Sequence, residues 1–313
     1  MKKIITLLLF GLFAAISFAK TPLTIVVGFP PGGDTDVLAR IVATKLTTIL
    51  NRPVVVENRV GASGAIASNY VASAPTDGSV IMLAPSTFVT APLVNSNIKY
   101  NAVTDFTPIM QLSGHGMVAV VNSNMGVTNI KELVIANRDG RVRNFGSPGV
   151  GTPMHILGEM FNRVARTDIV HIPFKGNAEV VNNMLGNQIS FTWITLLPVI
   201  PQVEAGKMTV IGIAGSKRSP FYPNVPTLAE QGIKDVEVDS WLGFLGPKDL
   251  SKEIVAELNA RLNQVIQMPE VKEKLTAMAM VPVGTGPEVF KDTINKDTLK
   301  YTRVVKTLGI KIE

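Results

Sequence analysis

The stretch FPPGGDTDVLAR, residues Phe29 to Arg40, places two prolines and two glycines between an apolar run and a helical pattern. The run before it, LTIVVGF from Leu23 to Phe29, has the length and the β-branched content of a buried strand. Beyond it, apolar residues recur at helical spacing from Leu38 to Ile49. The stretch therefore predicts a strand-to-helix turn whose glycines allow close approach, and whose open helix N–H groups can meet an anion.

The N-terminus of the 313-residue chain has the features of a secretory signal peptide. Lys2 and Lys3 precede the apolar run Ile4 to Ile16, and Ser17 to Ala19 form a small-x-small cleavage site. A retained anchor helix is the alternative, but the run is shorter than the roughly 20 residues that a span needs. We expect residues 1–19 to be removed after Ala19 and the mature protein to be soluble and periplasmic.

Composition and charge restrict the class of protein further. There is no cysteine, so the exported chain has neither disulfides nor a lipid-modified cysteine and must rely on its core. Lys and Arg outnumber Asp and Glu by 30 to 24. The densest basic run, Arg138 to Arg143, contains no aromatic residue, so we expect a solvated turn and no nucleic-acid binding.

Strand-like and helix-like runs alternate along the chain, which predicts an α/β protein with parallel sheets covered by helices. The rhythm restarts after Asn122, and the run Ser240 to Gly246 is expected to return the chain to the first lobe. We predict one discontinuous lobe from residues 20–121 and 241–313, and a second from 122–240. Two β-strand crossings would form the hinge.

A second glycine turn occurs in NFGSPGVGTPMH, Asn144 to His155, where a strand ends and a helix begins. Thr152 is the expected N-cap and Pro153 the first helical residue. Two helix N-termini directed into one crevice at the carboxyl ends of strands suit a ligand with one or two carboxylates. The alternative is that the glycines only permit tight strand-to-helix packing.

The two aspartates of the first turn leave the charge of the ligand open. Asp34 is expected to cap the helix and offset its dipole. Asp36 is the candidate to face the crevice and to bind an amine, a hydroxyl or a water of the ligand.

Two further loops supply candidate ligand-binding residues. Ser86 and Thr87 follow a strand end in APSTFVTAP, and Lys175 precedes a helix in PFKGNAE. Lys175 is a candidate to neutralise a carboxylate, or else a solvated lysine. Trp193 is either a wall of the pocket or a core residue.

The sequence gives little support for catalysis, a metal or a cofactor. His115, His155 and His171 lack ligand spacing to a carboxylate or cysteine, and no dinucleotide or P-loop motif is present. Ser147 and His155 suggest a nucleophile and a base, yet the glycine-x-serine-x-glycine elbow is missing. We therefore predict a binding protein, and keep a periplasmic acyl-transfer hydrolase that uses these two residues as the alternative.

Nearly the whole mature chain resembles the Bug family, the periplasmic solute-binding receptors of tripartite tricarboxylate transporters. Blocks in the same serial order carry the resemblance. They are FPPGGDTDVLAR, VVVENRVGASGAIASNYVASAPTDGSVIMLAP, DFTPI, SPGVGTPMHILGEMF, HIPFKGNAEVVNNMLGNQISF, EAGK, VPTLAEQG and WLGFLGPK.

This resemblance implies a two-lobed type II periplasmic-binding-protein fold, of the Venus flytrap kind, that closes on a small carboxylate. It also implies a monomer that docks to inner-membrane permease subunits, and a receptor that presents ligand to a membrane sensor would look the same in sequence. The carried-over ligand-binding positions lie in the FPPGG loop, after the LAP strand, in the SPGVGT loop and in the PFKGN loop. They are Phe29, Pro30, Gly32, Gly33, Asp36, Ser86, Thr87, Ser147, Gly149, Gly151, Thr152, His155 and Lys175.

One position departs from the family pattern. Where the family commonly has Phe-Asp, this chain has Trp193-Ile194. We infer a more apolar or aromatic distal pocket, and expect an aromatic or branched carboxylate in preference to citrate or a polar amino acid.

Overall fold

The structure is a computed structural model that describes residues 21–310. The expected signal peptide, residues 1–19 with cleavage after Ala19, lies outside the described residues. Within residues 21–310, no helix combines the length and the apolar character needed to cross a membrane.

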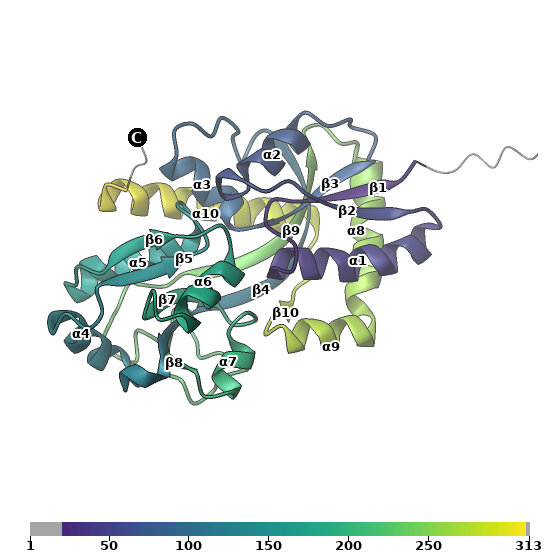
Figure 1. Cartoon of the computed structure of the whole chain (residues 1–313). Coiled ribbons are helices and arrows are strands. Elements are labelled where there is room, and N and C mark those ends of the chain that lie inside the picture. Colours follow the sequence, from purple (N-terminus) through teal and green to yellow (C-terminus); the bar gives the residue numbers. More distant parts are fainter. Residues whose placement is uncertain (1–20, 311–313) are drawn as a thin grey trace, which may run out of the picture.

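The first lobe is built on three parallel strands (Figure 1). β1 (Leu23–Val27) lies between β2 (Val54–Asn58) and β3 (Val80–Pro85). Four of the five residues of β1 are buried, as its continuous apolar run predicts for a central parallel strand. The helices of this lobe are α1 (Asp34–Leu50), α2 (Ala65–Ala72) and α3 (Thr87–Val94).

Two long antiparallel strands connect the lobes. β4 (Phe106–Asn122) pairs with β9 (Asp239–Pro247) over its first part, and over its second part with strands of the second lobe. β9 also pairs with β3, so both strands belong to the first lobe before they cross. The return crossing agrees with the run predicted at Ser240 to Gly246. The two-lobed α/β fold with two strand crossings is confirmed.

The second lobe repeats the alternation of strands and helices. Its central strand β5 (Asn144–Ser147) pairs in parallel with β6 (Val170–Pro173) and with β7 (Phe191–Thr195). β7 and β8 (Met208–Ile213) both pair with β4 in antiparallel orientation. The helices are α4 (Ile130–Arg138), α5 (Pro153–Ala165), α6 (Asn177–Leu185) and α7 (Ile200–Glu204).

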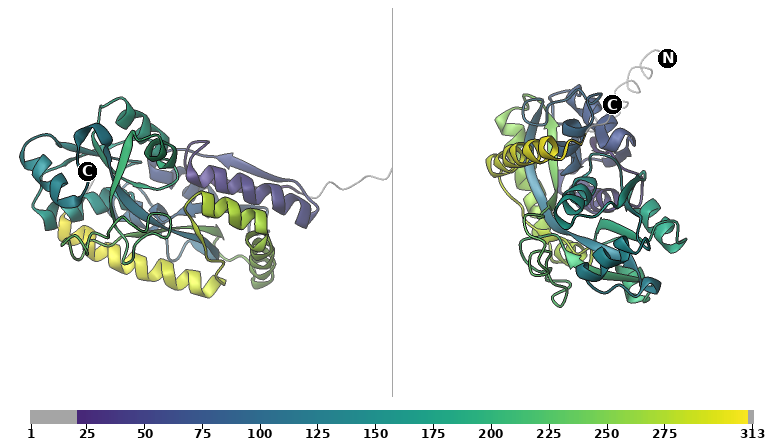
Figure 2. Two further views of the ribbon diagram at one scale, coloured as in Figure 1. Left: turned by 90° about the horizontal axis from the view of Figure 1, so that it is seen from below. Right: turned by 90° about the vertical axis from the view of Figure 1, so that its left-hand side faces the viewer.

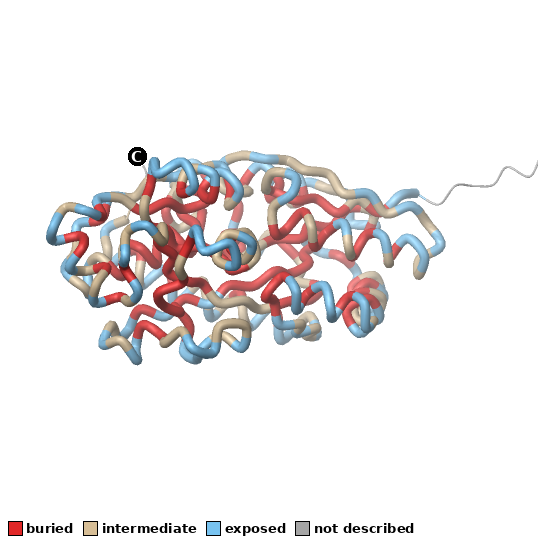
Figure 3. Tube along the Cα trace, turned by 60° about the horizontal axis from the view of Figure 1, so that its bottom comes forward, coloured by how far each residue is buried: buried red, intermediate tan, exposed pale blue. Residues whose placement is uncertain are grey.

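The C-terminal helices return to the first lobe. α8 (Lys252–Gln267) and α9 (Pro269–Ala277) pack on the core of that lobe, and the short strand β10 (Val281–Pro282) pairs with β4. Burial follows the strands and the inner faces of the helices (Figure 3). Each lobe therefore has a core of its own, which leaves the surface between the lobes available for a site.

The last helix, α10 (Pro287–Leu308), runs along the molecule past both lobes (Figure 2). Its residues Phe290 and Ile294 belong to a core cluster of the first lobe, whereas Tyr301 and Val305 belong to a cluster of the second. The C-terminal segment thus packs on both lobes, and the division of the chain at residues 121/122 and 240/241 stays a prediction.

Candidate functional site

A cavity of about 280 Å³ lies between the lobes, close to the lower end of the roughly 300–1,000 Å³ that small-molecule sites occupy. Residues of both lobes line it, together with His115 of β4 and Ser240 and Leu242 of β9. The first-lobe lining is Phe29, Pro30, Pro31, Gly33, Asp34, Thr35, Pro85 and Thr87; the remainder is His115, Pro148, Met154, Lys175, Gly176, Asn177, Ala178, Glu179, Thr195, Ser240 and Leu242.

Three helix N-termini that lack a side-chain cap open on this cavity. The N-caps of α1, α3 and α6 are Gly33, Ser86 and Gly176, and none of them accepts a hydrogen bond from the first turn through its side chain. The first N–H groups of a helix have no intrahelical partner, and the helix dipole makes that end positive. The lining therefore favours an anionic group of a ligand.

The turn before α1 is held by Asp36. Its carboxylate, 2% exposed, accepts hydrogen bonds from the Gly32 N–H at 2.8 Å, from Asn58 Nδ2 at 2.9 Å and from Arg40 Nε at 3.0 Å. Burial raises the pKa of Asp36, but these hydrogen bonds outweigh burial and hold the pKa below its ordinary value. Asp36 thus fastens the glycine turn, and Gly32 can adopt its positive φ of 82° because it has no side chain.

Asp34, and not Asp36, faces the cavity. Its carboxylate, 8% exposed, accepts a hydrogen bond from Thr195 Oγ1 at 2.5 Å and one from Asn177 Nδ2 at 3.3 Å. Thr195 ends β7 and Asn177 begins α6, so this contact joins the two lobes. The expected roles of the two aspartates are therefore exchanged.

The other two uncapped helix ends contribute hydroxyl and amide groups. Thr87 lines the cavity, while Ser86 is fully buried behind it and its Oγ lies 2.8 Å from the Ser240 Oγ on β9. At α6, the Lys175 N–H donates to Glu179 Oε2 at 2.8 Å, and both of these side chains are exposed at the rim. Lys175 is thus placed to meet a ligand at the opening of the cavity.

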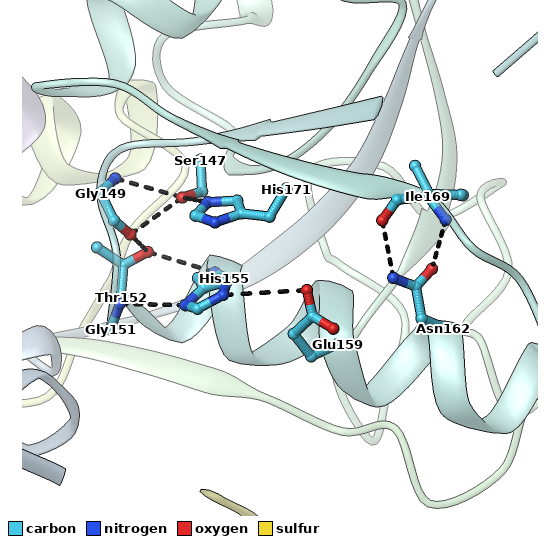
Figure 4. Close-up of polar contacts among 9 residues, drawn as sticks. All are labelled: Ser147, Gly149, Gly151, Thr152, His155, Glu159, Asn162, Ile169 and His171. Atoms are coloured by element: carbon cyan, nitrogen blue, oxygen red, sulfur yellow. Dashed lines mark hydrogen bonds and ion pairs between the residues drawn. The ribbon is translucent and has the colours of Figure 1, made fainter. Parts of the chain in front are cut away.

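The second glycine turn uses its polar groups internally (Figure 4). The Thr152 side chain accepts from the His155 N–H and donates to the Gly149 carbonyl, and the Gly151 N–H donates to His155 Nδ1 at 3.1 Å. The Ser147 Oγ lies 2.6 Å from His171 Nε2. The helix end of α5 is therefore capped by its own residues, unlike the ends of α1, α3 and α6.

The histidines of this turn are neutral. Because the Gly151 N–H donates to His155 Nδ1, that nitrogen is an acceptor and carries no proton. The His155 and His171 rings stack with centroids 4.0 Å apart. Burial lowers the pKa of His155 to about 4, and burial together with the repulsion that a protonated His155 would exert lowers the pKa of His171 to about 3.

Several sequence-predicted residues of the second lobe lie outside the cavity lining. Gly149 lines a neighbouring hollow of about 600 Å³, which shares Phe29, Pro148 and Lys175 with the cavity. From the SPGVGTPMH stretch, only Pro148 and Met154 line the cavity. The residues that were expected at the ligand and do not line the cavity are Gly32, Asp36, Ser86, Ser147, Gly149, Gly151, Thr152, His155 and Trp193.

Trp193 is a core residue of the second lobe and not a wall of the cavity. It is fully buried and packs on Phe161 and Phe191, with ring centroids 5.3 and 5.2 Å away. Ile194 is also fully buried, in the cluster on the other face of the sheet. The inference of an aromatic distal pocket therefore lacks the residues on which it depended.

Sequence reasoning missed Asn177, Thr195, His115 and Ser240, which all line the cavity. Thr195 is the last residue of β7 and Asn177 the first of α6. Since ligands in α/β proteins bind beyond the carboxyl ends of strands, the end of this strand was a better signal than the tryptophan within it. Within residues 21–310, no group of three or more His, Cys, Asp or Glu side chains is arranged to hold a metal ion.

The two lobes, the paired strand crossings and the cavity between them define the class of periplasmic binding proteins. Within that class, the chain belongs to the tripartite tricarboxylate transporter receptor family, whose model matches residues 38–310. The predicted resemblance to the Bug proteins is confirmed. BugT from Bordetella pertussis is 30% identical over 307 residues, which cover 96% of this chain and 93% of that protein.

Solved structures agree with this assignment. The periplasmic binding protein BugD superposes with a TM-score of 0.87 at 29% identity, over 93% of this chain and 99% of that one. An R. palustris protein with adipate gives 0.88 at 30% identity, over 93% and 99%. MatC from Rhodopseudomonas palustris with bound malate gives 0.83 at 25% identity, over 91% and 98%. The chain is thus a solute-binding protein of this family.

Proposed function

We propose that this protein captures a small carboxylate in the periplasm and delivers it to the permease of a tripartite tricarboxylate transporter. The observation that carries the proposal is the cavity between the lobes, on which the uncapped N-termini of α1, α3 and α6 converge. Three positive helix ends around one small space favour an anion. The adipate and malate in structures of two relatives support the same ligand class.

Closure of the lobes holds the ligand. In the described structure the Ser63 Oγ donates to the Val150 carbonyl at 2.7 Å, and the Thr90 Oγ1 donates to the Gly151 carbonyl at 2.6 Å. Both bonds join the first lobe to the turn before α5, next to the cavity. A ligand that contacts both lobes stabilises this closed form over an open one, because only the closed form makes all of the contacts.

Export and docking complete the proposal. The chain is expected to be exported by the signal peptide, cleaved after Ala19, and to act as a monomer that docks to inner-membrane permease subunits. Family membership supports this partner. Uptake of radiolabelled ligand in cells with and without the permease genes tests it. Uptake that does not depend on the permease would favour a membrane sensor as the partner.

We propose that the protein turns over no substrate. The alternative hydrolase would need Ser147 as nucleophile and His155 as base. Ser147 is fully buried, pairs with His171 and donates to the Gly149 carbonyl at 3.0 Å, and neither Ser147 nor His155 lines the cavity. A nucleophile must reach the substrate, so this arrangement supports binding rather than acyl transfer.

Calorimetric titration of the mature protein with a panel of mono-, di- and tricarboxylates tests the proposed function. We expect one ligand per protein and no product after prolonged incubation, with the mixture followed by mass spectrometry. Failure of every carboxylate to bind would reject the receptor proposal. Product formation that Ser147→Ala abolishes would favour the hydrolase.

A further inference from the structure

The cavity between the lobes contains a buried carboxylate that has no cationic partner. Asp34 is 8% exposed and lines the cavity. In the part of the chain that the structure describes, no lysine, arginine or histidine forms a salt bridge with it. The only lysine in the lining, Lys175, is exposed at the rim. The donors that Asp34 does have, Thr195 and Asn177, are both neutral, so a cationic group of a ligand could still pair with this carboxylate.

The neighbours of Asp34 leave a second acceptor without a donor. Because a carboxylate only accepts, the amide of Asn177 must direct Nδ2 toward Asp34, and the same Nδ2 lies 3.2 Å from Thr195 Oγ1. This fixes the Asn177 Oδ1 on the opposite side of the amide. Among residues 21–310, no donor reaches that buried oxygen. The Asn177 amide therefore gives Asp34 a neutral donor and brings no positive charge to it.

His115 does not neutralise this site. It lines the cavity, and within the described residues its buried Nδ1 has no hydrogen-bond partner. Burial lowers the pKa of His115 to about 4, even though the nearby charge of Asp34 acts in the opposite direction. The imidazole is therefore neutral at physiological pH and supplies no positive charge to Asp34.

We propose that the ligand is an amino carboxylate whose ammonium group binds to Asp34 in the cavity, which makes Asp34 the residue that determines specificity. The carboxylate of the ligand then meets the uncapped ends of α3 and α6. A ligand that bears only negative charge would place a like charge close to Asp34. Coulomb repulsion between these two charges would weaken the binding of such a ligand. The inference rests on the proposed function and names the substrate class of the same site.

Matched ligand pairs test this inference by calorimetric titration of the mature protein. The pairs are aspartate with succinate, glutamate with glutarate, and 2-aminoadipate with adipate, so that each pair differs by one amino group. We expect the best-bound amino acid to bind at least about tenfold more tightly than its partner without nitrogen, since a charge-assisted hydrogen bond replaces a repulsion. Malate, which offers a donor without a positive charge, should bind more weakly than aspartate.

The variant Asp34→Asn removes the charge and keeps the shape. It should bring the affinity ratio within the best pair close to one, mainly by improving the binding of the diacid. Asp139→Asn is the control for net charge, because Asp139 is exposed at the end of α4 and does not line the cavity. This control should leave the ratio unchanged. Thermal unfolding of each variant checks that it is folded.

The outcomes separate this inference from the proposed function. If diacids bind as tightly as the amino acids to the unaltered protein, or if malate matches aspartate, the inference is overturned while the receptor function stands. If the ratio persists in Asp34→Asn, Asp34 does not determine it and the inference is likewise overturned. If no member of any pair binds, the carboxylate receptor proposal fails and the inference fails with it.

Discussion

The two glycine turns before α1 and α5 have similar sequences and opposite uses. Each follows a strand, contains at least one glycine at positive φ and delivers a helix N-terminus to the region between the lobes. In the turn before α1, Asp36 accepts a hydrogen bond from the Gly32 N–H from outside the cavity lining, and the N-terminus of α1 remains open to the cavity. In the turn before α5, the Gly151 N–H donates to the His155 ring and the His155 N–H donates to the Thr152 side chain, so these backbone donors are already paired. A glycine turn therefore marks a ligand site only where the first helix N–H groups remain unpaired.

Charge differs between the turns as well. The turn before α1 is held by an ionised carboxylate, whereas the turn before α5 is held by two neutral, stacked histidines. One depends on Asp36 losing its proton and the other on His155 not gaining one. The two turns should consequently respond in different ways to substitution and to acid.

The largest expected effect comes from the two aspartates of the first turn. Asp36→Ala should lower the free energy of unfolding by about 3 kcal/mol, because the buried carboxylate that accepts from the Gly32 N–H, the Asn58 amide and the Arg40 guanidinium is lost. Asp34→Ala, two residues earlier, should lower the free energy of unfolding by less than about 1.5 kcal/mol, because it removes only the hydrogen bonds from Asn177 and Thr195 at the edge of a cavity. Urea unfolding of both variants measures the difference. Equal losses would contradict the assigned roles.

Acid should weaken the second turn before it affects the first. The pKa values of His155 and His171 are below the ordinary value of 6.5, so the unfolded chain binds more protons than the folded protein as pH falls below 6.5. Stability should decrease from there until the folded pKa values of about 4 and about 3 are passed. By pH 5 we expect a loss of about 1 kcal/mol or more per histidine. Asp36 stays ionised between pH 7 and pH 5, because its hydrogen bonds hold its pKa below the ordinary value of 3.8.

His155→Gln isolates this effect. The Gln side chain offers an acceptor to the Gly151 N–H but does not titrate in this range. Between pH 7 and pH 5, the variant should lose less unfolding free energy than the unaltered protein, by the about 1 kcal/mol or more that one histidine contributes. Glu159, whose pKa burial raises above 4.5, takes up its proton with the opposite sign and slightly offsets the loss. An unchanged pH dependence in the variant would show that acid acts elsewhere.

The elements were largely predictable from the sequence, whereas the lining of the cavity was not. Apolar runs such as Leu23 to Phe29 and helical spacing from Leu38 report local structure directly. The sequence does not predict the start of β4 at Phe106, because Pro108, Gly114 and Gly116 interrupt the strand pattern. Pairing with β9 keeps this segment extended, with register shifts at Pro108/Met110 and Gln111/Ser113.

The side chains at the site depend on how the lobes meet. Asn177 and Thr195 reach Asp34 across a sequence separation that no local pattern encodes. Trp193 and Thr195 are two residues apart and therefore lie on the same face of β7. Trp193 packs against Phe161 of α5, whereas Thr195, at the end of the strand, lines the cavity. The positions of Asp34 and Asp36 in the first turn of a helix were predictable, but not which of them faces the ligand. Two residues apart on a helix, their side chains point in nearly opposite directions.

Two glycines with similar backbones make a matched pair for the next effect. Gly32 and Gly151 have φ of 82° and 77°, so alanine at either position costs about 1 kcal/mol in backbone strain. An added Cβ at Gly32 meets nothing within 4 Å, whereas at Gly151 it lies 3.0 Å from the Ala91 Cα of the other lobe. Gly151→Ala should lose about 1 kcal/mol more than Gly32→Ala and should also weaken ligand binding, because α3 and the α5 turn must separate.

Urea unfolding and calorimetric titration of both glycine variants distinguish these contributions. Equal stability losses would mean that the lobes accommodate the methyl group without cost. Equal ligand affinities would mean that the α5 turn does not press on α3 when the ligand is bound.

The smallest effect is expected where the two turns are linked across the lobes. The Ser63 Oγ, in the segment that precedes α2, donates to the Val150 carbonyl of the α5 turn at 2.7 Å. Ser63→Ala removes this one bond, which forms only when the lobes are closed. Ligand affinity should fall by about two- to fivefold, corresponding to a net hydrogen bond of about 0.5–1 kcal/mol, while the free energy of unfolding changes little.

The matched variant Ser73→Ala, at the end of α2, should leave the affinity unchanged, because Ser73 does not line the cavity or the hollow beside it. The bond stabilises the closed state alone, so stopped-flow measurements should show faster ligand release with an unchanged association rate. Unchanged release would mean that the α5 turn contributes to the fold of its own lobe and not to closure.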